Sequence, residues 1–249
     1  MTVGEWALVG DLQAESARVG ARPVTVVAPA GMAVDPARKV GFLAAFAGPY
    51  ELAPESAEPV TILLGAEALP DEGRMYGTTG YVTGTPFWDG SVSSVWIHEY
   101  VHAVQTFETA PEMDWLREAS ATYFAMRFMA EQYDGVSEAD LRHRIDAIER
   151  EGVSLANASS WADSGHYDRG GRLLYALDEW IRAETAGEAT LVDVVRAMNR
   201  AEEPITIERF ESIVAETTGT EPAWLRPAIE TSEYDLADRI DRFESNHSA

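Results

Sequence analysis

Two histidines spaced one helical turn apart constrain this chain more than any other feature of its sequence. His98 and His102 stand at positions i and i+4 of the segment HEYVH, so on a helix their imidazoles leave the same face, about 40° apart. That spacing lets two neutral ring nitrogens reach one zinc ion at about 2.0–2.1 Å. Glu99 lies at the edge of the same face, where it can hold a water molecule on the metal without ligating the metal. The segment predicts a zinc-bearing helix; a core helix with hydrogen-bonded histidines is the simpler alternative.

The segment WLREASATYF offers a third, anionic ligand on the next helix. Its Glu118 lies sixteen residues after His102, in an apolar stretch that argues against a surface position. The small residues 119–121 beside it would let this helix approach the histidine helix closely. Three other acids compete for the role, Glu108, Glu112 and Asp114, but they lie in or near the connecting loop, where solvation explains them. We therefore expect one zinc ion per chain, bound by two histidines and Glu118.

The first ninety residues carry strand signals. Short β-branched runs bounded by proline and glycine, at Pro23–Ala28 and Pro59–Gly65, predict two strands. Asp35–Leu52 between them predicts a helix that starts at Asp35 and Pro36 and is broken by Gly48 and Pro49. Arg74–Trp88 has three glycines and no helical period, so it predicts a turn with an exposed edge strand or a hairpin.

From residue 91 onward the pattern is mainly helical. The histidine helix is expected to run from an N-cap near Asp89 or Ser91 to about Phe107. Further helices are predicted at Pro111–Tyr133, Ser137–Gly152, His166–Thr185, Thr190–Asn199, Ile207–Thr217 and about Ser232–Phe243, with capping boxes at Ser137/Asp140 and Thr190/Asp193. A small mixed β-sheet with an edge strand, followed by a mainly helical part, is the α+β order. We expect residues 1–249 to form a single unit, with a sheet-containing part at 1–90 and a helical part at 91–249.

The amino-acid composition limits which metal ligands and which binding partners are possible. The chain has no cysteine, which leaves His and carboxylate as metal ligands, and its 42 acidic against 19 basic residues give a net charge of −23. Such a surface repels nucleic acid and anionic lipid, so we expect neither as a partner. No signal peptide or membrane-spanning run is apparent, and we expect a soluble, cytoplasmic protein. Lys39 is the only lysine, and this acidic, lysine-poor composition resembles that of proteins from halophilic archaea.

Together, H-E-x-x-H and W-L-x-E-A resemble the gluzincin zinc metallopeptidases, in particular the aminopeptidase N and glycyl aminopeptidase groups. The segment Tyr167–Asn199 strengthens the resemblance, because it begins like the Y-x-[KR]-G helix of those families. The resemblance covers about residues 96–199. It implies a thermolysin-like catalytic domain in which Glu99 is the general base and acid and Tyr167 hydrogen-bonds the oxyanion of the tetrahedral intermediate.

One departure from that family affects the expected substrate. Its aminopeptidases carry a G-x-M-E-N segment whose glutamate grips the free α-amine, whereas the corresponding residues 77–90 contain no glutamate. The sequence therefore predicts a zinc-dependent hydrolase of peptide or protein substrates and points to endopeptidase or uncharacterised metallohydrolase activity. It leaves the choice between endopeptidase and exopeptidase open, and also the oligomeric state. The alternatives are a catalytically inactive binding module of the same fold and an amide hydrolase acting on a small molecule.

The residues around Tyr167 have simpler expected roles. His166 could be a second oxyanion donor, but neighbouring helical residues diverge by about 100°, so we expect it to face solvent. Arg169, Arg172 and Arg182 are expected to form ion pairs on the surface, with contact of Arg169 or Arg172 to a substrate carboxylate as the alternative.

The charge balance predicts a dependence of stability on salt. Repulsion among 42 acidic residues destabilises the compact state at low salt. Molar KCl shortens the Debye length to about 3 Å and screens that repulsion. We expect the thermal unfolding midpoint to rise steadily from low salt to molar KCl. A midpoint that stays flat over this range contradicts a halophilic adaptation.

Overall fold

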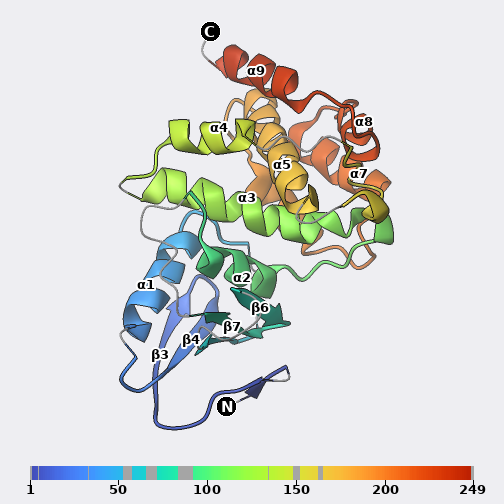
Figure 1. Ribbon diagram of the computed structural model, residues 1–249. Coiled ribbons are helices and arrows are strands. Elements are labelled where there is room, and N and C mark those ends of the chain that lie inside the picture. The colour runs from blue at the N-terminus through green and yellow to red at the C-terminus, as the bar shows by residue number, and fades with distance from the viewer. Residues whose placement is uncertain are drawn as a thin grey trace. The chain divides into compact units, whose positions relative to one another are not determined.

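The computed structural model describes residues 2–4, 6–32, 34–52, 58–65, 72–83, 92–133, 135–147, 152–161 and 165–247. The chain forms two compact units that interleave in sequence. The first comprises residues 1–106 and 124–136, and the second comprises residues 107–123 and 137–249. Figure 1 labels most of the helices and strands of both units. Whether the two units act as the single catalytic unit expected from the sequence stays a prediction.

The first unit contains a five-stranded mixed sheet in the order β3-β4-β5-β7-β6. Its strands are β3 (Leu12–Val19), β4 (Arg22–Pro29), β5 (Val60–Gly65), β6 (Gly73–Tyr76) and β7 (Thr79–Thr83). The three central strands run parallel, and the two edge strands are antiparallel to their neighbours. The central β5 is buried on both faces, which explains its continuous apolar run. A two-stranded ribbon of β1 (Thr2–Val3) and β2 (Trp6–Ala7) precedes the sheet.

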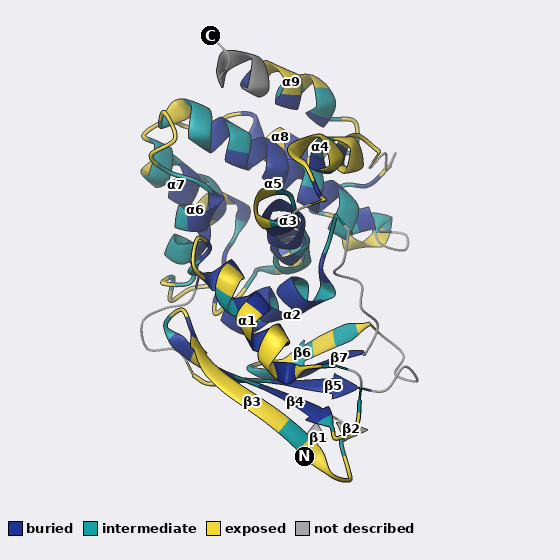
Figure 2. Ribbon diagram, turned by 90° about the vertical axis from the view of Figure 1, so that its left-hand side faces the viewer, coloured by how far each residue is buried: buried dark blue, intermediate teal, exposed yellow. Residues whose placement is uncertain are grey.

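Two helices pack on this sheet. The first, α1 (Pro36–Ala47), contacts β3 and β4, while α2 (Val95–Val104) contacts β6, β7 and α1. Figure 2 shows α1 and α2 side by side, with their buried faces toward the strands. The single lysine, Lys39, is 5% exposed on α1, and its Nζ lies 5.0 Å from the ring centroid of Trp96 on α2. A buried cation over an indole therefore fixes these two helices to each other.

Aromatic side chains form the rest of this core. They come from α1, from the segment after it, and from the C-terminal half of α3 (Trp115–Gln132). Phe46 is stacked on Tyr50 at 5.2 Å between centroids and meets Phe128 edge-on at 5.5 Å. The Tyr50 hydroxyl also donates a hydrogen bond to Glu131. The second half of α3 thus belongs to the core of the first unit.

The second unit is helical apart from one isolated β-bridge, as far as the described residues show. Its helices are α4 (Glu138–Asp146), α5 (Gly165–Glu184), α6 (Leu191–Met198), α7 (Ile207–Thr218), α8 (Leu225–Glu230) and α9 (Leu236–His247), with short 3-10 turns at Pro111–Met113 and Ala158–Ser160. The central element is α5, which contacts α4, α6, α7 and α9. Twelve of its residues are buried, so the other helices surround it.

A buried carboxylate joins three helices of the second unit. Asp178 on α5 is 1% exposed. It accepts hydrogen bonds from the Tyr123 hydroxyl on α3 at 2.7 Å and from the Leu191 backbone N–H on α6 at 2.6 Å. Arg182 Nε, one turn further along α5, lies 2.7 Å away and supplies the counter-charge. Both oxygens of the carboxylate are thus satisfied, which the burial of a charge requires.

The α+β class predicted from sequence is confirmed, and most elements lie where they were expected. Both capping boxes are present, and Asp35 caps α1. The expected hairpin is β6–β7, whose turn places Gly77 at a φ of 63°, in the left-handed region that two-residue hairpin loops use. The strand β3 and the helix α8 were not anticipated, because β3 is polar and mostly exposed and α8 contains a proline.

The histidine helix is shorter than predicted. It starts at the N-cap Ser94 and ends at Val104, because Gln105 turns to an extended conformation with ψ of 105°. The expected N-caps Asp89 and Ser91 lie outside the described residues, as do residues 84–88 of the predicted hairpin region and 148–151 of the predicted fourth helix. Among the described residues, no helix is both long enough and apolar enough to cross a membrane.

The contacts of Asp178 predict a large loss of stability on its removal. The substitution Asp178→Ala leaves the buried Tyr123 hydroxyl and Leu191 N–H without an acceptor, at about 1–3 kcal/mol each. We expect the free energy of unfolding, measured by urea denaturation, to fall by about 3 kcal/mol. The matched control Glu184→Ala, at an exposed position of the same helix, should change it by less than about 0.5 kcal/mol. Equal effects of the two substitutions would show that the buried network contributes nothing.

Candidate metal centre

The two histidines of α2 lie with their rings together. Their Nε2 atoms are 3.1 Å apart, and the ring centroids are separated by 4.7 Å at an interplanar angle of 79°. Both side chains are half-buried. A zinc ion bound tetrahedrally to two imidazoles at about 2.0–2.1 Å would hold their nitrogens roughly 3.3 Å apart. The observed separation fits such an ion with only a small adjustment of the rings.

The residue that ends α2 orients one of these rings. Gln105 Oε1 lies 3.0 Å from Nδ1 of His102. An amide oxygen at this position fixes the tautomer with the proton on Nδ1, which leaves the Nε2 lone pair for a metal. Gln105 is 5% exposed, so the contact is protected from water.

A buried arginine from the sheet supports the same end of the helix. Arg22 on β4 is 1% exposed, and its Nη1 donates to the Ala103 carbonyl at 2.7 Å. A cation at the C-terminus of a helix complements its dipole. Burial lowers the pKa of Arg22 and raises that of the neighbouring Tyr100. The last turn of α2, which carries His102, is therefore tied to the sheet.

Glu99 lies against the edge strand. Its side chain is 5% exposed, and it packs on the backbone of β6. A Cβ atom added to Gly73 would lie 2.6 Å from Cγ and 2.9 Å from Oε1 of Glu99. A larger residue at this position would force the Glu99 side chain to move, so Gly73 helps to define its place, which the sequence pattern did not reveal.

Glu118 lies in the first turn of α3 and is half-buried. In the second unit this turn packs closely on α5, where a Cβ on Gly170 would lie 2.5 Å from Cβ of Ala119. One ligand atom each of His98, His102 and Glu118 lies within 4.8 Å of the others, and this is the group of three that could hold a metal ion among the described residues. The competing acids Glu108 and Asp114 are exposed, and Asp114 instead accepts a hydrogen bond from Thr109 at 2.8 Å.

Tyr167 lies in the first turn of α5, beside an aromatic stack that was not expected. The ring of His166 is stacked on Trp161 at 4.6 Å and 20°, and its centroid lies 4.4 Å from that of Tyr167. Trp161 is anchored by an Nε1 hydrogen bond to the Ser154 carbonyl. Burial lowers the pKa of His166, and the charge of Glu118 partly offsets this. The expectation that His166 faces solvent is wrong, because the preceding loop places an indole over its ring.

The arginines of α5 also differ from expectation. Arg169 is 8% exposed, and its Nη2 donates to the Thr231 carbonyl at 2.8 Å. Burial lowers the pKa of this guanidinium, and neighbouring Arg172 lowers it further. Arg182 binds the buried Asp178, described above. The predicted surface ion pair of Arg169 is therefore wrong, because its side chain is buried and donates to a backbone carbonyl.

Solved structures of similar shape indicate what kind of fold this is. The chain is similar to an aminopeptidase N family protein from Idiomarina loihiensis, with a TM-score of 0.74 and 15% identity over 93% of this chain and 49% of that chain. It is also similar to a variant of the M1 zinc metallopeptidase of Deinococcus radiodurans bound to a Tyr-Ser-Ala substrate, with a TM-score of 0.65 and 16% identity over 91% of this chain and 53% of that chain. The chain has the fold of M1 zinc metallopeptidases.

The likeness to these zinc metallopeptidases covers only part of their chains, and the sequence identity is low. The chain spans about half the length of the solved proteins it matches. Comparison of the sequence with models of protein families and with curated proteins finds no match. The likeness therefore lies in the arrangement of the sheet and helices.

The contact between Gln105 and His102 predicts a measurable effect on metal affinity. The substitution Gln105→Ala frees the imidazole to rotate and to change tautomer. We expect zinc affinity, measured by competition with a chromophoric chelator, to fall by about 10–100-fold. The control Gln132→Ala, at an exposed position near the end of α3, should leave it unchanged. Unchanged affinity in Gln105→Ala would mean that this amide does not orient the ligand.

Proposed function

We propose that the chain is a zinc-dependent hydrolase that cleaves peptide bonds, with one zinc ion held by His98, His102 and Glu118. The observation that carries the proposal is the convergence of these three ligand atoms within 4.8 Å, on a fold shared with M1 zinc metallopeptidases. Two neutral imidazoles and one carboxylate form a ligand set of the catalytic type, since they leave a fourth position open. Zinc bound there would lower the pKa of water toward neutrality and polarise a carbonyl group.

Glu99 is the proposed general base and acid. It follows the first histidine directly on α2, and this position puts residue 99 at the edge of the histidine face. Its burial against Gly73 restricts the carboxylate to a narrow range of positions. From there it can accept a proton from the attacking water and deliver it to the leaving amine. Because a purely structural zinc site needs no carboxylate at this position, Glu99 favours the enzyme over an inactive binding module.

Tyr167 is the proposed oxyanion donor. A phenol O–H directed at developing negative charge stabilises the transition state more than the substrate, which is what accelerates a reaction. Its half-buried position at the start of α5, in contact with the His166 ring, supports this role by limiting the motion of the phenol.

An extended peptide is the proposed substrate. Strand β6 is the outer strand of the sheet, and an outer strand can pair with a peptide through backbone hydrogen bonds. This strand lies next to Glu99, whose side chain packs against Gly73 of β6. Residues 77–90 contain no glutamate to bind a free α-amine, which favours cleavage within a chain. Hydrolysis of a small-molecule amide is the second candidate reaction.

The decisive substitution is Glu99→Gln. It keeps the shape and burial of the side chain but removes the base, so zinc content should stay near one per chain while hydrolysis of a quenched internal peptide falls by at least about 10²-fold. Elemental analysis and the peptide assay, each with and without a chelator, measure the two quantities on the same preparation. Full turnover in the variant would rule out the proposed base.

Glu118→Ala provides the complementary test. Removal of the anionic ligand should lower zinc content and activity together, because the site keeps only its two imidazoles. Unchanged zinc stoichiometry would exclude Glu118 from the ligand set. If the unsubstituted protein binds zinc but cleaves neither blocked nor unblocked peptides, a small-molecule amide or a binding function takes the place of peptide hydrolysis.

A further inference from the structure

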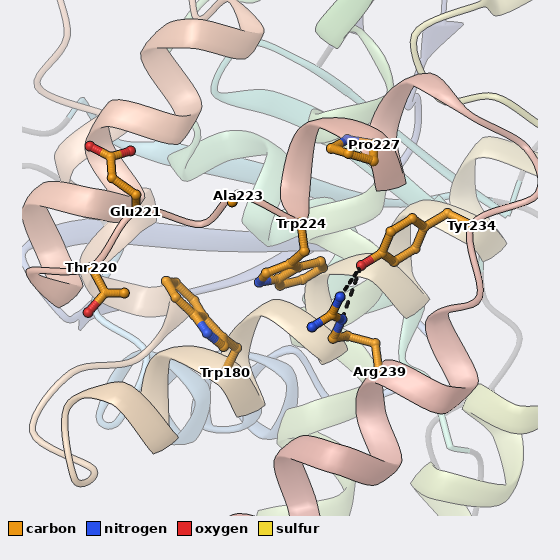
Figure 3. A pocket seen from close by; sticks show the side chains of 8 residues that line it. All are labelled: Trp180, Thr220, Glu221, Ala223, Trp224, Pro227, Tyr234 and Arg239. Atoms are coloured by element: carbon orange, nitrogen blue, oxygen red, sulfur yellow. Dashed lines mark hydrogen bonds between the residues drawn. The ribbon is translucent and has the colours of Figure 1, made fainter.

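A pocket of about 450 Å³ lies within the second unit, apart from every residue assigned a role so far. Figure 3 shows its lining: Trp180 of α5, Trp224 before α8, and Tyr234 and Arg239 at the start of α9, with Glu221 at one side. The two indoles are buried, at 5% and 8% exposure, whereas Glu221 is exposed. A pocket of this volume, lined by two indoles and by the polar side chains of Tyr234 and Arg239, has room for a small molecule.

The arginine in this pocket has no carboxylate partner among the described residues. Its guanidinium lies 5.7 Å from the ring centroid of Trp224, 5.8 Å from that of Tyr234 and 5.7 Å from that of Phe243. By contrast, Arg226 of the neighbouring α8 contacts three glutamates. In a chain with 42 acidic residues, an arginine surrounded by rings instead of carboxylates keeps its charge available to a ligand.

The hydrogen bonds of Arg239 leave donors directed to the pocket. Its Nε and Nη2 both donate to the Tyr234 hydroxyl, at 3.0 and 2.7 Å. The phenol oxygen accepts both, so its own proton must point to a further acceptor. Arg239 Nη1 is not engaged by any described residue, and Figure 3 shows the guanidinium beside Trp224 with this nitrogen turned away from Tyr234. One phenol O–H and one guanidinium edge therefore share a pocket that the indoles of Trp180 and Trp224 also line.

We propose that this pocket binds a small aromatic carboxylate. The carboxylate accepts from Arg239 Nη1 and from the Tyr234 hydroxyl, and the aromatic body lies against the indoles of Trp180 and Trp224. A charged acceptor satisfies both open donors at once, and charge-assisted hydrogen bonds of this kind are the strong ones. A cationic ligand is disfavoured because the guanidinium already occupies the aromatic faces. The site requires neither zinc nor the proposed peptidase activity.

The test compares a carboxylate with its neutral isostere. The probes are 3-phenylpropionate and 3-phenylpropionamide, which do not mask tryptophan fluorescence, titrated at constant ionic strength into the full chain. We expect the carboxylate to bind at least about tenfold more tightly than the amide, as a difference of 1.4 kcal/mol implies. Equal binding of the two probes, or no fluorescence or saturation-transfer signal up to about 10 mM, would overturn the proposal.

Three substitutions test whether the preference for the carboxylate arises in this pocket. Tyr234→Phe keeps the ring and removes the hydroxyl, so it should reduce the preference for the carboxylate severalfold. Arg239→Met keeps the apolar stem and should abolish the preference, while Glu221→Gln should preserve the affinity or increase it by removing a nearby like charge. If Arg239→Met does not fold, judged by circular dichroism, Tyr234→Phe alone decides. A carboxylate preference that survives Tyr234→Phe unchanged would place the ligand elsewhere.

Discussion

The buried carboxylate of Asp178 is the group on which the arrangement of the second unit depends. It receives hydrogen bonds from α3 and from the N-terminus of α6, and its charge is balanced by Arg182 on its own helix. A carboxylate with 1% exposure is stable only when such donors surround it. Because Tyr123, its partner on α3, lies little more than one helical turn after Glu118, the same network fixes the end of the helix that carries the proposed anionic ligand.

Buried cations have the corresponding role in the first unit. Arg22 connects the sheet to the last carbonyls of α2, and Lys39 lies over Trp96 on the same helix. Both act on the helix that carries His98 and His102, one near its C-terminus and one near its N-terminus. Each removes a positive charge from the surface of a chain that has only 19 basic residues. The surface of the protein is therefore more acidic than the composition alone suggests, because some of the basic residues are buried.

The aromatic residues of the second unit serve two different purposes. The ring of His166, stacked on Trp161, lies beside Tyr167, which is proposed to take part in catalysis. The cluster of Trp224, Tyr234 and Phe243 instead surrounds Arg239. In the first case the rings restrict a hydrogen-bond donor, and in the second they replace the carboxylates that would otherwise neutralise a cation. In both clusters a polar or charged group is packed against the apolar faces of aromatic rings.

The sequence by itself determined the α+β class, the capped helices and the spacing of His98, Glu99 and His102, because these follow from local periodicity and cap chemistry. It did not reveal Gly73 against Glu99, the indole over His166 or the inward turn of Arg169. Each of these is a contact between residues far apart in the chain, or between a helix and a loop of no regular pattern. Only the tertiary structure leaves Arg239 among rings, since the packing of whole elements decides which side chains meet. Local patterns place a residue on a face, and the neighbour it finds there is decided by the fold.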